Sequence, residues 1–170
     1  MSLFIFGLAI FGSLMSNSDS IGEGDSAPDF TLVDQNGSIH TLSSYFGQKI
    51  VVYFYPKDDT PGCTKEACGI RDNYKEFISE QIKVFGISYD NPESHKKFAK
   101  KYEIPFILLS DSDKKVAKLY AANGILFAKR KTYLINEEGR IIKIFQNVDV
   151  SDHANEIINE FRTAGLKKAE

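Results

Sequence analysis

The pattern of apolar and polar positions along the chain predicts strands that alternate with helices. Three short runs, rich in β-branched and aromatic residues, are typical of strands that are covered on both faces: Ile50 to Tyr55, Lys83 to Tyr89 and Phe106 to Leu109. Two pairs of short strands surround turn sequences and therefore predict β-hairpins. These pairs are residues 29–33 with 39–42, and residues 131–135 with 140–145.

Four segments predict helices. The first begins near Cys63, and its apolar residues follow helical spacing: Ala67, Ile70, Tyr74, Phe77 and Ile78. Asn91 is a suitable N-cap for a second helix that ends near Lys101, because Pro92 follows it. A short third helix is expected at residues 114–121. The fourth is capped by Ser151 or Asp152 and has an apolar stripe: Ala154, Ile157, Ile158 and Phe161.

This order of elements predicts an α/β fold. We expect a mainly parallel central sheet with helices on both faces, an N-terminal β-hairpin, and an antiparallel edge that the late hairpin provides. Ligands of such sheets bind at the carboxyl ends of the strands. The first buried strand ends at Tyr55, so the loop from Pro56 to Cys63 is the expected place of a site.

The first twenty residues differ from the rest. Residues 1–18 carry no charge, and the apolar stretch 3–15 would form a helix of about 20 Å, too short for a hydrocarbon core of about 30 Å. It fits a weak export signal that lacks a preceding Lys or Arg, an apolar segment packed on the domain or a partner, a membrane-surface anchor, or an artificial extension. We therefore divide the chain into an apolar segment and linker (1–20) and a domain (21–170), with membrane contact expected only through residues 3–15.

Composition and charge exclude several classes of protein. A chain of 170 residues with 42% hydrophobic residues suits one globular domain that needs no disulfide or metal to hold its core. The net charge of -2 gives no broad basic surface, so we expect no nucleic-acid partner. The three histidines, His40, His95 and His153, are far apart in the sequence and show no metal-ligand spacing with each other or with the two cysteines.

Cys63 is the strongest candidate for chemistry. It lies at the start of the first predicted helix, where unpaired backbone N–H groups and the positive end of the helix dipole favour a thiolate, the nucleophilic form. The simpler interpretation is a small buried apolar residue. Cys68 lies five residues further along the same helix, which separates the two Cα atoms by roughly 8.6 Å. A disulfide needs about 4.4–6.8 Å, so only a helix that unwinds locally could form this bridge.

Thr60 and the prolines shape the approach to Cys63. With Pro61 as the first helical residue, Thr60 is the predicted N-cap, and its side-chain oxygen should face the N–H of Cys63. The same hydroxyl could also bind a ligand beside the sulfur. Pro56 and Pro61 either fix and shield this loop or act only as turn formers.

Four motifs together resemble the peroxiredoxin family. Pro56-x-x-x-Thr60-x-x-Cys63 is similar to the signature in which Pro, Thr and the attacking Cys surround a peroxide. Residues 24–30 resemble the amino-terminal motif of the family, and residues 130–135 its late Arg-x-[Ser/Thr]-aromatic motif. The partner cysteine at Cys68 is similar to that of the bacterioferritin-comigratory-protein or Q-type branch. Asn136, where the branch usually has Asp, and the apolar N-terminus are departures from the pattern.

The resemblance implies a thioredoxin-like fold and a thioredoxin-dependent peroxidase in antioxidant defence. Cys63 would reduce hydrogen peroxide or organic hydroperoxides and become a sulfenic acid, and Cys68 would then form an intramolecular disulfide with it. Thioredoxin or a similar dithiol would restore both thiols, without metal, haem or nucleotide. Pro56, Thr60 and Arg130 would hold the peroxide, and a guanidinium at Arg130 suits an oxygen or a thiolate. A monomer in the cytoplasm is expected.

Further alternatives stay open. Glu66 and Arg71 form either a network behind the site, as the resemblance suggests, or an exposed ion pair on the helix. Tyr55 is expected in the core. A thiol-disulfide oxidoreductase on the same fold would need Cys-x-x-Cys, which the chain lacks. A peroxide sensor whose thiols only signal would have the same residues, and catalytic turnover would separate it from an enzyme.

Overall fold

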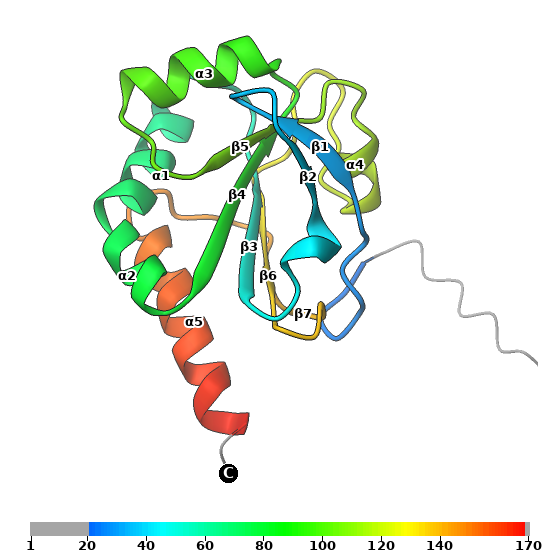
Figure 1. Cartoon of the computed structure of the whole chain (residues 1–170), viewed down its shortest axis with the longest axis vertical. Coiled ribbons are helices and arrows are strands. Elements are labelled where there is room, and N and C mark those ends of the chain that lie inside the picture. Colours follow the sequence, from blue (N-terminus) through cyan, green and yellow to red (C-terminus); the bar gives the residue numbers. More distant parts are fainter. Residues whose placement is uncertain (1–20, 169–170) are drawn as a thin grey trace, which may run out of the picture.

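The computed structural model describes residues 21–168, and their centre is one sheet of seven strands (Figure 1). The strand order is β2-β1-β5-β4-β3-β6-β7. The strands are β1 (Thr31–Asp34), β2 (Ile39–Thr41), β3 (Lys49–Phe54), β4 (Ile82–Ser88), β5 (Ile107–Ser110), β6 (Lys131–Ile135) and β7 (Ile141–Phe145). The predicted α/β fold class and the predicted strand positions are confirmed to within a few residues.

The direction of the strands differs from the expectation of a mainly parallel sheet. Only β3, β4 and β5 pair in parallel, and β3 and β4 hold the middle of the sheet. β1 pairs antiparallel with β5 on one side, and β6 pairs antiparallel with β3 on the other. The sheet is therefore mixed, with antiparallel strands on both flanks. Apolar patterning cannot distinguish these arrangements, because a strand buried on both faces has the same sequence in either direction.

Both predicted hairpins are confirmed. β1 and β2 pair antiparallel from Thr31 opposite Thr41, and β6 and β7 pair antiparallel with a register shift near Leu134. Gly37 and Gly139 each have a positive φ, +84° and +77°, in the two turns. A side chain would be strained there, which explains why each turn has glycine at this position.

The helices are α1 (Pro61–Asp72), α2 (Tyr74–Ser79), α3 (Pro92–Lys101), α4 (Lys115–Leu119) and α5 (His153–Lys168), with a 3-10 helix η1 (Leu42–Tyr45). The Asn91 cap is confirmed, since its side chain accepts a hydrogen bond from the Ser94 N–H. The expected single helix after Cys63 is instead two, because Asn73 interrupts it with φ −98° and ψ 8°. Ile78 is consequently 62% exposed rather than part of the apolar stripe.

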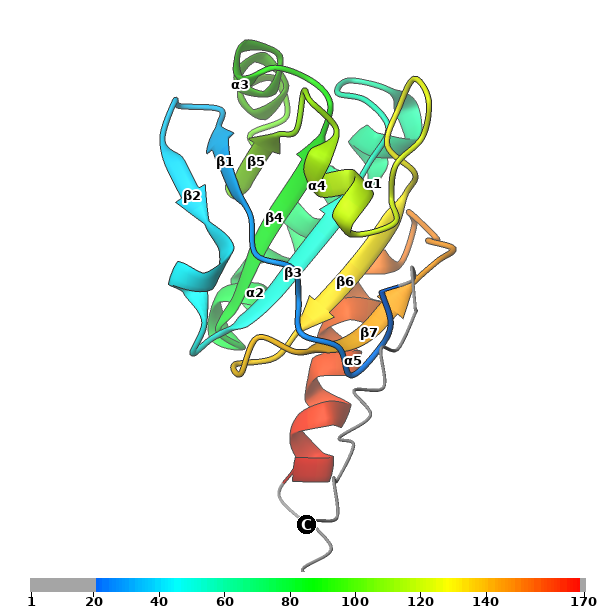
Figure 2. The same ribbon diagram turned by 90° about the vertical axis from the view of Figure 1, so that its right-hand side faces the viewer.

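Two apolar clusters lie on the two faces of the sheet. Figure 2 shows helices on both sides of the sheet, with α4 on one side and α1, α2 and α5 on the other. One cluster is formed with α1, α2, α3 and α5, and it includes Cys63 and the predicted stripe of α5. The other lies under α4 and the segment that leads into β1. The chemistry predicted at Cys63 therefore belongs to the face that α1 and α5 cover.

Residues 1–20 lie outside the described part of the chain, and so do the expectations about an export signal, an anchor or a packed apolar segment. Within residues 21–168, none of the helices combines the length and apolar character needed to cross a bilayer.

Candidate active site

The site begins where β3 ends. β3 runs to Phe54, residues 55–60 form a loop, and α1 starts at Pro61. Thr60 has an extended backbone, φ −96° and ψ 153°, and Pro61 follows it as a first helical residue with a suitable fixed φ. The sequence therefore ends a buried strand and starts a helix within a few residues. This brings Cys63 into the first turn of α1, at the carboxyl ends of the parallel strands.

Arg130 contacts Cys63 because of the sheet register. β6 pairs with β3, and Lys131 lies opposite Phe54, so the residue before β6 reaches the loop that follows β3. Arg130 Nη2 donates a hydrogen bond to Cys63 Sγ over 3.3 Å. Cys63 is only 2% exposed, whereas 21% of the Arg130 side chain is exposed, so the sulfur end of this contact is the one removed from water. A cation at this distance stabilises a thiolate relative to a thiol.

Glu66 completes the site from the next turn of α1. Its Oε2 accepts a charge-assisted hydrogen bond from Arg130 Nη1, so one guanidinium bridges the sulfur and the carboxylate. Glu66 is 1% exposed, and its Oε1 has no hydrogen-bond partner within residues 21–168. Burial raises the pKa of Glu66 to about 7, although the charge of Arg130 opposes this rise. The carboxyl group can therefore change its protonation near neutral pH.

Two glycines make room around this cluster. A Cβ at Gly62 would lie 3.3 Å from Arg130 Nη2, so a side chain there would press on the guanidinium. A Cβ at Gly86, on β4, would lie 2.7 Å from the Tyr53 hydroxyl. That hydroxyl is buried and has no hydrogen-bond partner within the described chain. Burial and the negative charges of Glu66 and Cys63 raise the pKa of Tyr53 well above its ordinary value, so it stays protonated.

Thr60 has the predicted position but a different hydrogen bond. It is the N-cap of α1, yet its side chain makes no cap bond, and Oγ1 donates to the Lys57 carbonyl oxygen at 2.8 Å. The expectation that this oxygen faces the Cys63 N–H is therefore wrong. The loop turns back on itself between Lys57 and Thr60, and this brings the carbonyl closer than the helix N–H groups. The Thr60 oxygen can still accept a hydrogen bond from a ligand. Pro56 begins the loop in a bend and is partly exposed.

Cys68 lies on α1 and is partly buried. Both cysteines are free thiols in a continuous helix, which agrees with the prediction that an intact helix keeps them apart. Glu66 does belong to a network behind the site, as expected, but Arg71 is not its partner, and the alternative of an exposed Glu66–Arg71 ion pair is wrong. Glu66 is buried against Arg130, whereas Arg71 binds Asp72 and donates from Nη1 to the Tyr102 carbonyl oxygen.

A second buried cluster was not predicted from the sequence. Asp58, in the loop, receives hydrogen bonds from Tyr55 and Ser94 and lies 2.9 Å from His95 Nδ1. Tyr55 is in the core, as expected, but its hydroxyl is part of this cluster. The signal available in the sequence was weak. It consists of an Asp in the loop and a His at the position of α3 that turns toward the sheet.

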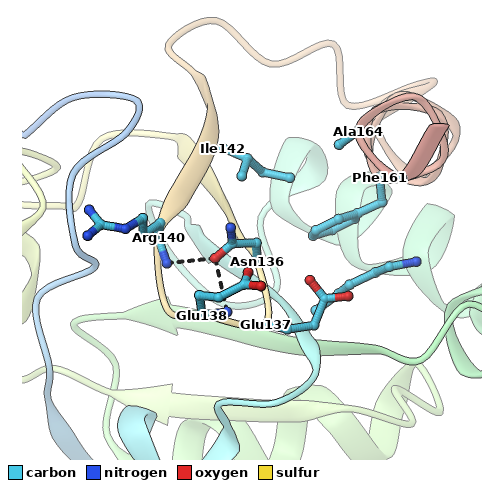
Figure 3. A pocket seen from close by; sticks show the side chains of 9 residues that line it. Asn136, Glu137, Glu138, Arg140, Ile142, Phe161 and Ala164 are labelled. Atoms are coloured by element: carbon cyan, nitrogen blue, oxygen red, sulfur yellow. Dashed lines mark hydrogen bonds between the residues drawn. The ribbon is translucent and has the colours of Figure 1, made fainter. Parts of the chain in front are cut away.

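A further pocket of the described chain is lined by residues that belong to neither cluster. Figure 3 shows a pocket at the other end of the sheet, with Asn136, Arg140 and Phe161 among its lining residues. Lys49, the first residue of β3, also lines this pocket. Cys63 lies beyond the opposite end of β3, in the helix that follows the loop after Phe54. Within residues 21–168, no three His, Cys, Asp or Glu side chains gather in a way that could hold a metal ion.

Comparison with known proteins identifies the family. The AhpC/TSA family model matches residues 23–144. The chain is 46% identical over 130 residues to a chloroplastic peroxiredoxin Q from Populus jackii, covering 75% of this chain and 61% of the relative. It is 42% identical over 150 residues to a putative peroxiredoxin bcp from Coxiella burnetii, covering 82% of this chain and 97% of the relative.

Solved structures agree with the sequence relatives. A peroxiredoxin Q mutant from Xylella fastidiosa superposes with a TM-score of 0.81 at 30% identity, covering 85% of this chain and 98% of that one. A bacterioferritin comigratory protein from Xanthomonas campestris, studied for alkyl peroxide reduction, gives a TM-score of 0.76 at 29% identity, covering 79% of this chain and 91% of that one. The chain spans about six tenths of the length of the plant relatives that it matches, for example 61% of the poplar protein. With the family match over most of its domain, the chain belongs to the AhpC/TSA family, in its peroxiredoxin Q and bcp branch.

Proposed function

We propose that this chain is a thiol-dependent peroxidase. The observation that carries this proposal is the hydrogen bond from Arg130 Nη2 to the sulfur of Cys63, a buried cysteine in the first turn of a helix. A permanent cation and a helix N-terminus both stabilise negative charge at this sulfur. The arrangement favours a nucleophilic thiolate, and the family relationship favours a hydroperoxide as its target.

The first step transfers one oxygen atom. The Cys63 thiolate attacks an oxygen of the hydroperoxide, the S–O bond forms and the O–O bond breaks. Cys63 becomes a sulfenic acid, and the leaving oxygen takes a proton to give water or an alcohol. Arg130 and the backbone N–H of Cys63 align the peroxide and stabilise the charge on the leaving oxygen, with Thr60 and Pro56 shaping the approach.

The second step uses Cys68. Its sulfur attacks the sulfenic sulfur, the S–S bond forms and the oxygen leaves as water. Because both cysteines belong to α1, the helix must open around them first. A dithiol reductant such as thioredoxin then exchanges with this disulfide and becomes oxidised itself. Hydrogen peroxide and organic hydroperoxides are the proposed substrates, and the activity is antioxidant.

The proposal extends to the setting of the enzyme. We expect a monomer that works in the cytoplasm, where a dithiol reductant keeps thiols reduced. The two free cysteines are compatible with such a compartment. The plant relatives are chloroplast proteins, so fractionation of cells that express the tagged full chain would test the location. Size measurement in solution would test the monomer.

Peroxide consumption with a thioredoxin system tests the proposed activity. Wild type should turn over, and Cys63→Ser should lose activity, because a hydroxyl is a far weaker nucleophile than a thiolate. Substantial turnover by Cys63→Ser would show that another residue attacks the peroxide. A wild-type protein that reacts once and is never recycled by any dithiol would instead indicate a sensor.

Cys68→Ser tests the intramolecular disulfide. The first step needs only Cys63, so this variant should still reduce one equivalent of peroxide. Recycling by thioredoxin should fall sharply, and sulfinic acid should accumulate at Cys63 under excess peroxide. Full thioredoxin-dependent turnover by Cys68→Ser would show that Cys68 is dispensable.

A further inference from the structure

Asp58 is a carboxylate buried inside the loop that precedes Cys63. It is 6% exposed, and three side chains surround its oxygens. The Tyr55 hydroxyl donates to Oδ1 at 2.7 Å, and the Ser94 hydroxyl donates to Oδ2 at 2.8 Å. His95 Nδ1 lies 3.1 Å from Oδ1 and 2.9 Å from Oδ2. A carboxyl group buried in this way needs hydrogen bonds to its oxygens, and these three side chains provide them.

The hydrogen bonds of His95 indicate where its protons are. The ring is fully buried, and Nε2 lies 3.1 Å from the carbonyl oxygen of Leu109. A carbonyl oxygen only accepts, so Nε2 carries a proton. Nδ1 faces both oxygens of Asp58, and the single Tyr55 proton already goes to one of them. The Tyr55 hydroxyl also lies 3.3 Å from Nδ1. One further proton between Nδ1 and Asp58 satisfies this arrangement and joins the two side chains by a hydrogen bond.

The same cluster fixes the course of the loop. The Asp58 N–H donates to Asp90 Oδ2 at 2.9 Å, and that oxygen also accepts from the Ser88 hydroxyl at 2.7 Å. Asp58 is thereby tied through its side chain to α3 and through its backbone to the segment after β4. Thr60, the N-cap of α1, lies only two residues further along the chain. A displacement of Asp58 would therefore be transmitted to the start of α1 and to Cys63.

We propose that Asp58 and His95 form a buried hydrogen-bonded pair whose role is to position the loop from Pro56 to Thr60 for the reaction of Cys63 with peroxide. Both are positioning residues, because their contacts are with the loop and with each other. This inference rests on the proposed peroxidase function. Removing one partner would leave buried polar atoms of the other without a hydrogen bond, and the loop would lose its anchor.

Nitrogen-15 NMR of the histidine side chains in the reduced wild-type protein tests the pair directly. His95 is assigned as the signal that His95→Gln loses. We expect Nδ1 of His95 to show its hydrogen bond to Asp58, so the chemical shift of Nδ1 should change in Asp58→Asn. An Nδ1 signal that is the same in wild type and in Asp58→Asn would overturn the proposal. This measurement needs no peroxide, so its outcome does not depend on the proposed function.

A matched pair of variants tests the positioning role. Asp58→Asn keeps the shape but replaces the carboxyl group by an amide, whereas Asp113→Asn makes the same change at an exposed acid outside the loop, which binds Lys115. The rate constant of reduced Cys63 with hydrogen peroxide should fall at least tenfold in Asp58→Asn, since misplacing reacting groups by about 1 Å costs up to about 100-fold. Asp113→Asn should stay within about twofold of wild type, as expected for a surface substitution.

Alkylation of Cys63 by iodoacetamide separates positioning from general damage. This reaction needs an accessible thiolate but no aligned peroxide, so it should fall much less than the peroxide reaction in Asp58→Asn. An equal fall in both reactions, or a folded Asp58→Asn with the wild-type peroxide rate, would overturn the positioning role. If Asp58→Asn does not fold, Ser94→Ala replaces it, with a severalfold fall in the peroxide rate as the expected result and no fall as the contrary one. A wild-type protein that does not react with peroxide would count against the proposed function alone.

Discussion

Two buried polar clusters lie on the same side of the sheet, and they differ in how completely their hydrogen bonds are satisfied. In the first, Arg130 bridges Cys63 and Glu66, while Glu66 Oε1 has no partner among residues 21–168. In the second, Asp58 and His95 use both oxygens and both ring nitrogens. An unsatisfied buried polar atom destabilises a fold. Its presence in the first cluster therefore indicates that Glu66 has a role other than stabilising the fold.

The difference separates reactivity from support. Glu66 has a pKa raised to about 7, and Arg130 binds both its carboxyl group and the Cys63 sulfur. The net charge around Cys63 therefore changes with pH near neutrality. Asp58 is enclosed by side chains of the loop and of α3, and these contacts keep the loop in one conformation. The first cluster should therefore respond to substitution through the rate of the reaction, and the second through the position and stability of the loop.

Arg130→Lys should give the largest effect. An ammonium keeps the positive charge but cannot donate from two fixed nitrogens to the sulfur and to Glu66 together. We expect the rate constant of reduced Cys63 with hydrogen peroxide to fall by about 100- to 1000-fold, as for the loss of a donor that stabilises a transition state. Stopped-flow measurement with Arg140→Lys as the control checks this, since Arg140 is exposed and donates to the Gly24 carbonyl oxygen. A wild-type rate in Arg130→Lys would show that Arg130 and Glu66 form an ion pair with no role in the reaction of Cys63.

Glu66→Gln should change how stability depends on pH. The folded protein holds a proton on Glu66 up to a pKa of about 7, whereas the unfolded chain releases it near the ordinary 4.5. The contribution of Glu66 to the free energy of unfolding is therefore fully present below pH 4.5 and is lost as pH rises to 7, by a few kcal/mol. Gln stays neutral, so the variant should lack this fall and be the more stable protein at pH 8.

Urea denaturation of wild type and Glu66→Gln at pH 5 and pH 8 measures this difference. His153 titrates too, since burial lowers its pKa, but its contribution is common to both proteins and cancels in the comparison. Glu137→Gln, at an exposed turn position, is the control and should follow wild type. Parallel curves for wild type and Glu66→Gln would mean that Glu66 stays ionised throughout and that the first cluster is as fixed as the second.

Oxidation should separate the two clusters in their dynamics. Forming the Cys63–Cys68 disulfide must break several backbone hydrogen bonds of α1, each worth about 0.5–1.5 kcal/mol net. Amide exchange over residues 63–70 should thus be at least about tenfold faster in the oxidised protein. Amides of α3 beside His95 should exchange equally in both states. Equal protection of α1, with the disulfide confirmed by mass spectrometry, would show that α1 need not open.

The sequence was informative where the determining signals are local. Pro61 and the apolar spacing that follows predicted a helix start at Cys63, and Asn36-Gly37 predicted a hairpin, because each signal acts over a few residues. The resemblance to peroxiredoxins selected Arg130. The antiparallel direction of β6 and the break at Asn73 depend on how elements pack, and apolar spacing alone does not encode them.

The second cluster shows the same limit more clearly. Asp58 and His95 are 37 residues apart, and their contact forms only when α3 packs over the loop. The bond of Thr60 to Lys57 was missed because loop geometry, which the N-cap rule does not describe, brings that carbonyl into reach. Long-range polar contacts of this kind leave little trace in a single sequence, even when the residues involved lie next to a recognised motif.

The two neighbouring tyrosines of β3 and its loop give the smallest but most direct comparison. Tyr55→Phe removes a donor from Asp58, which keeps Ser94 and His95, so the free energy of unfolding should fall by about 1–2 kcal/mol. Tyr53→Phe removes a buried hydroxyl with no partner in the described chain, so it should leave stability unchanged or raise it slightly. Both side chains are almost fully buried, and both substitutions delete one oxygen, so differences in packing largely cancel. Denaturation of the two variants side by side gives the result. If Tyr53→Phe were the more damaging change, the Tyr53 hydroxyl would make a hydrogen bond, direct or through water, that stabilises the fold, and the contrast between an unsatisfied and a satisfied hydroxyl would fail.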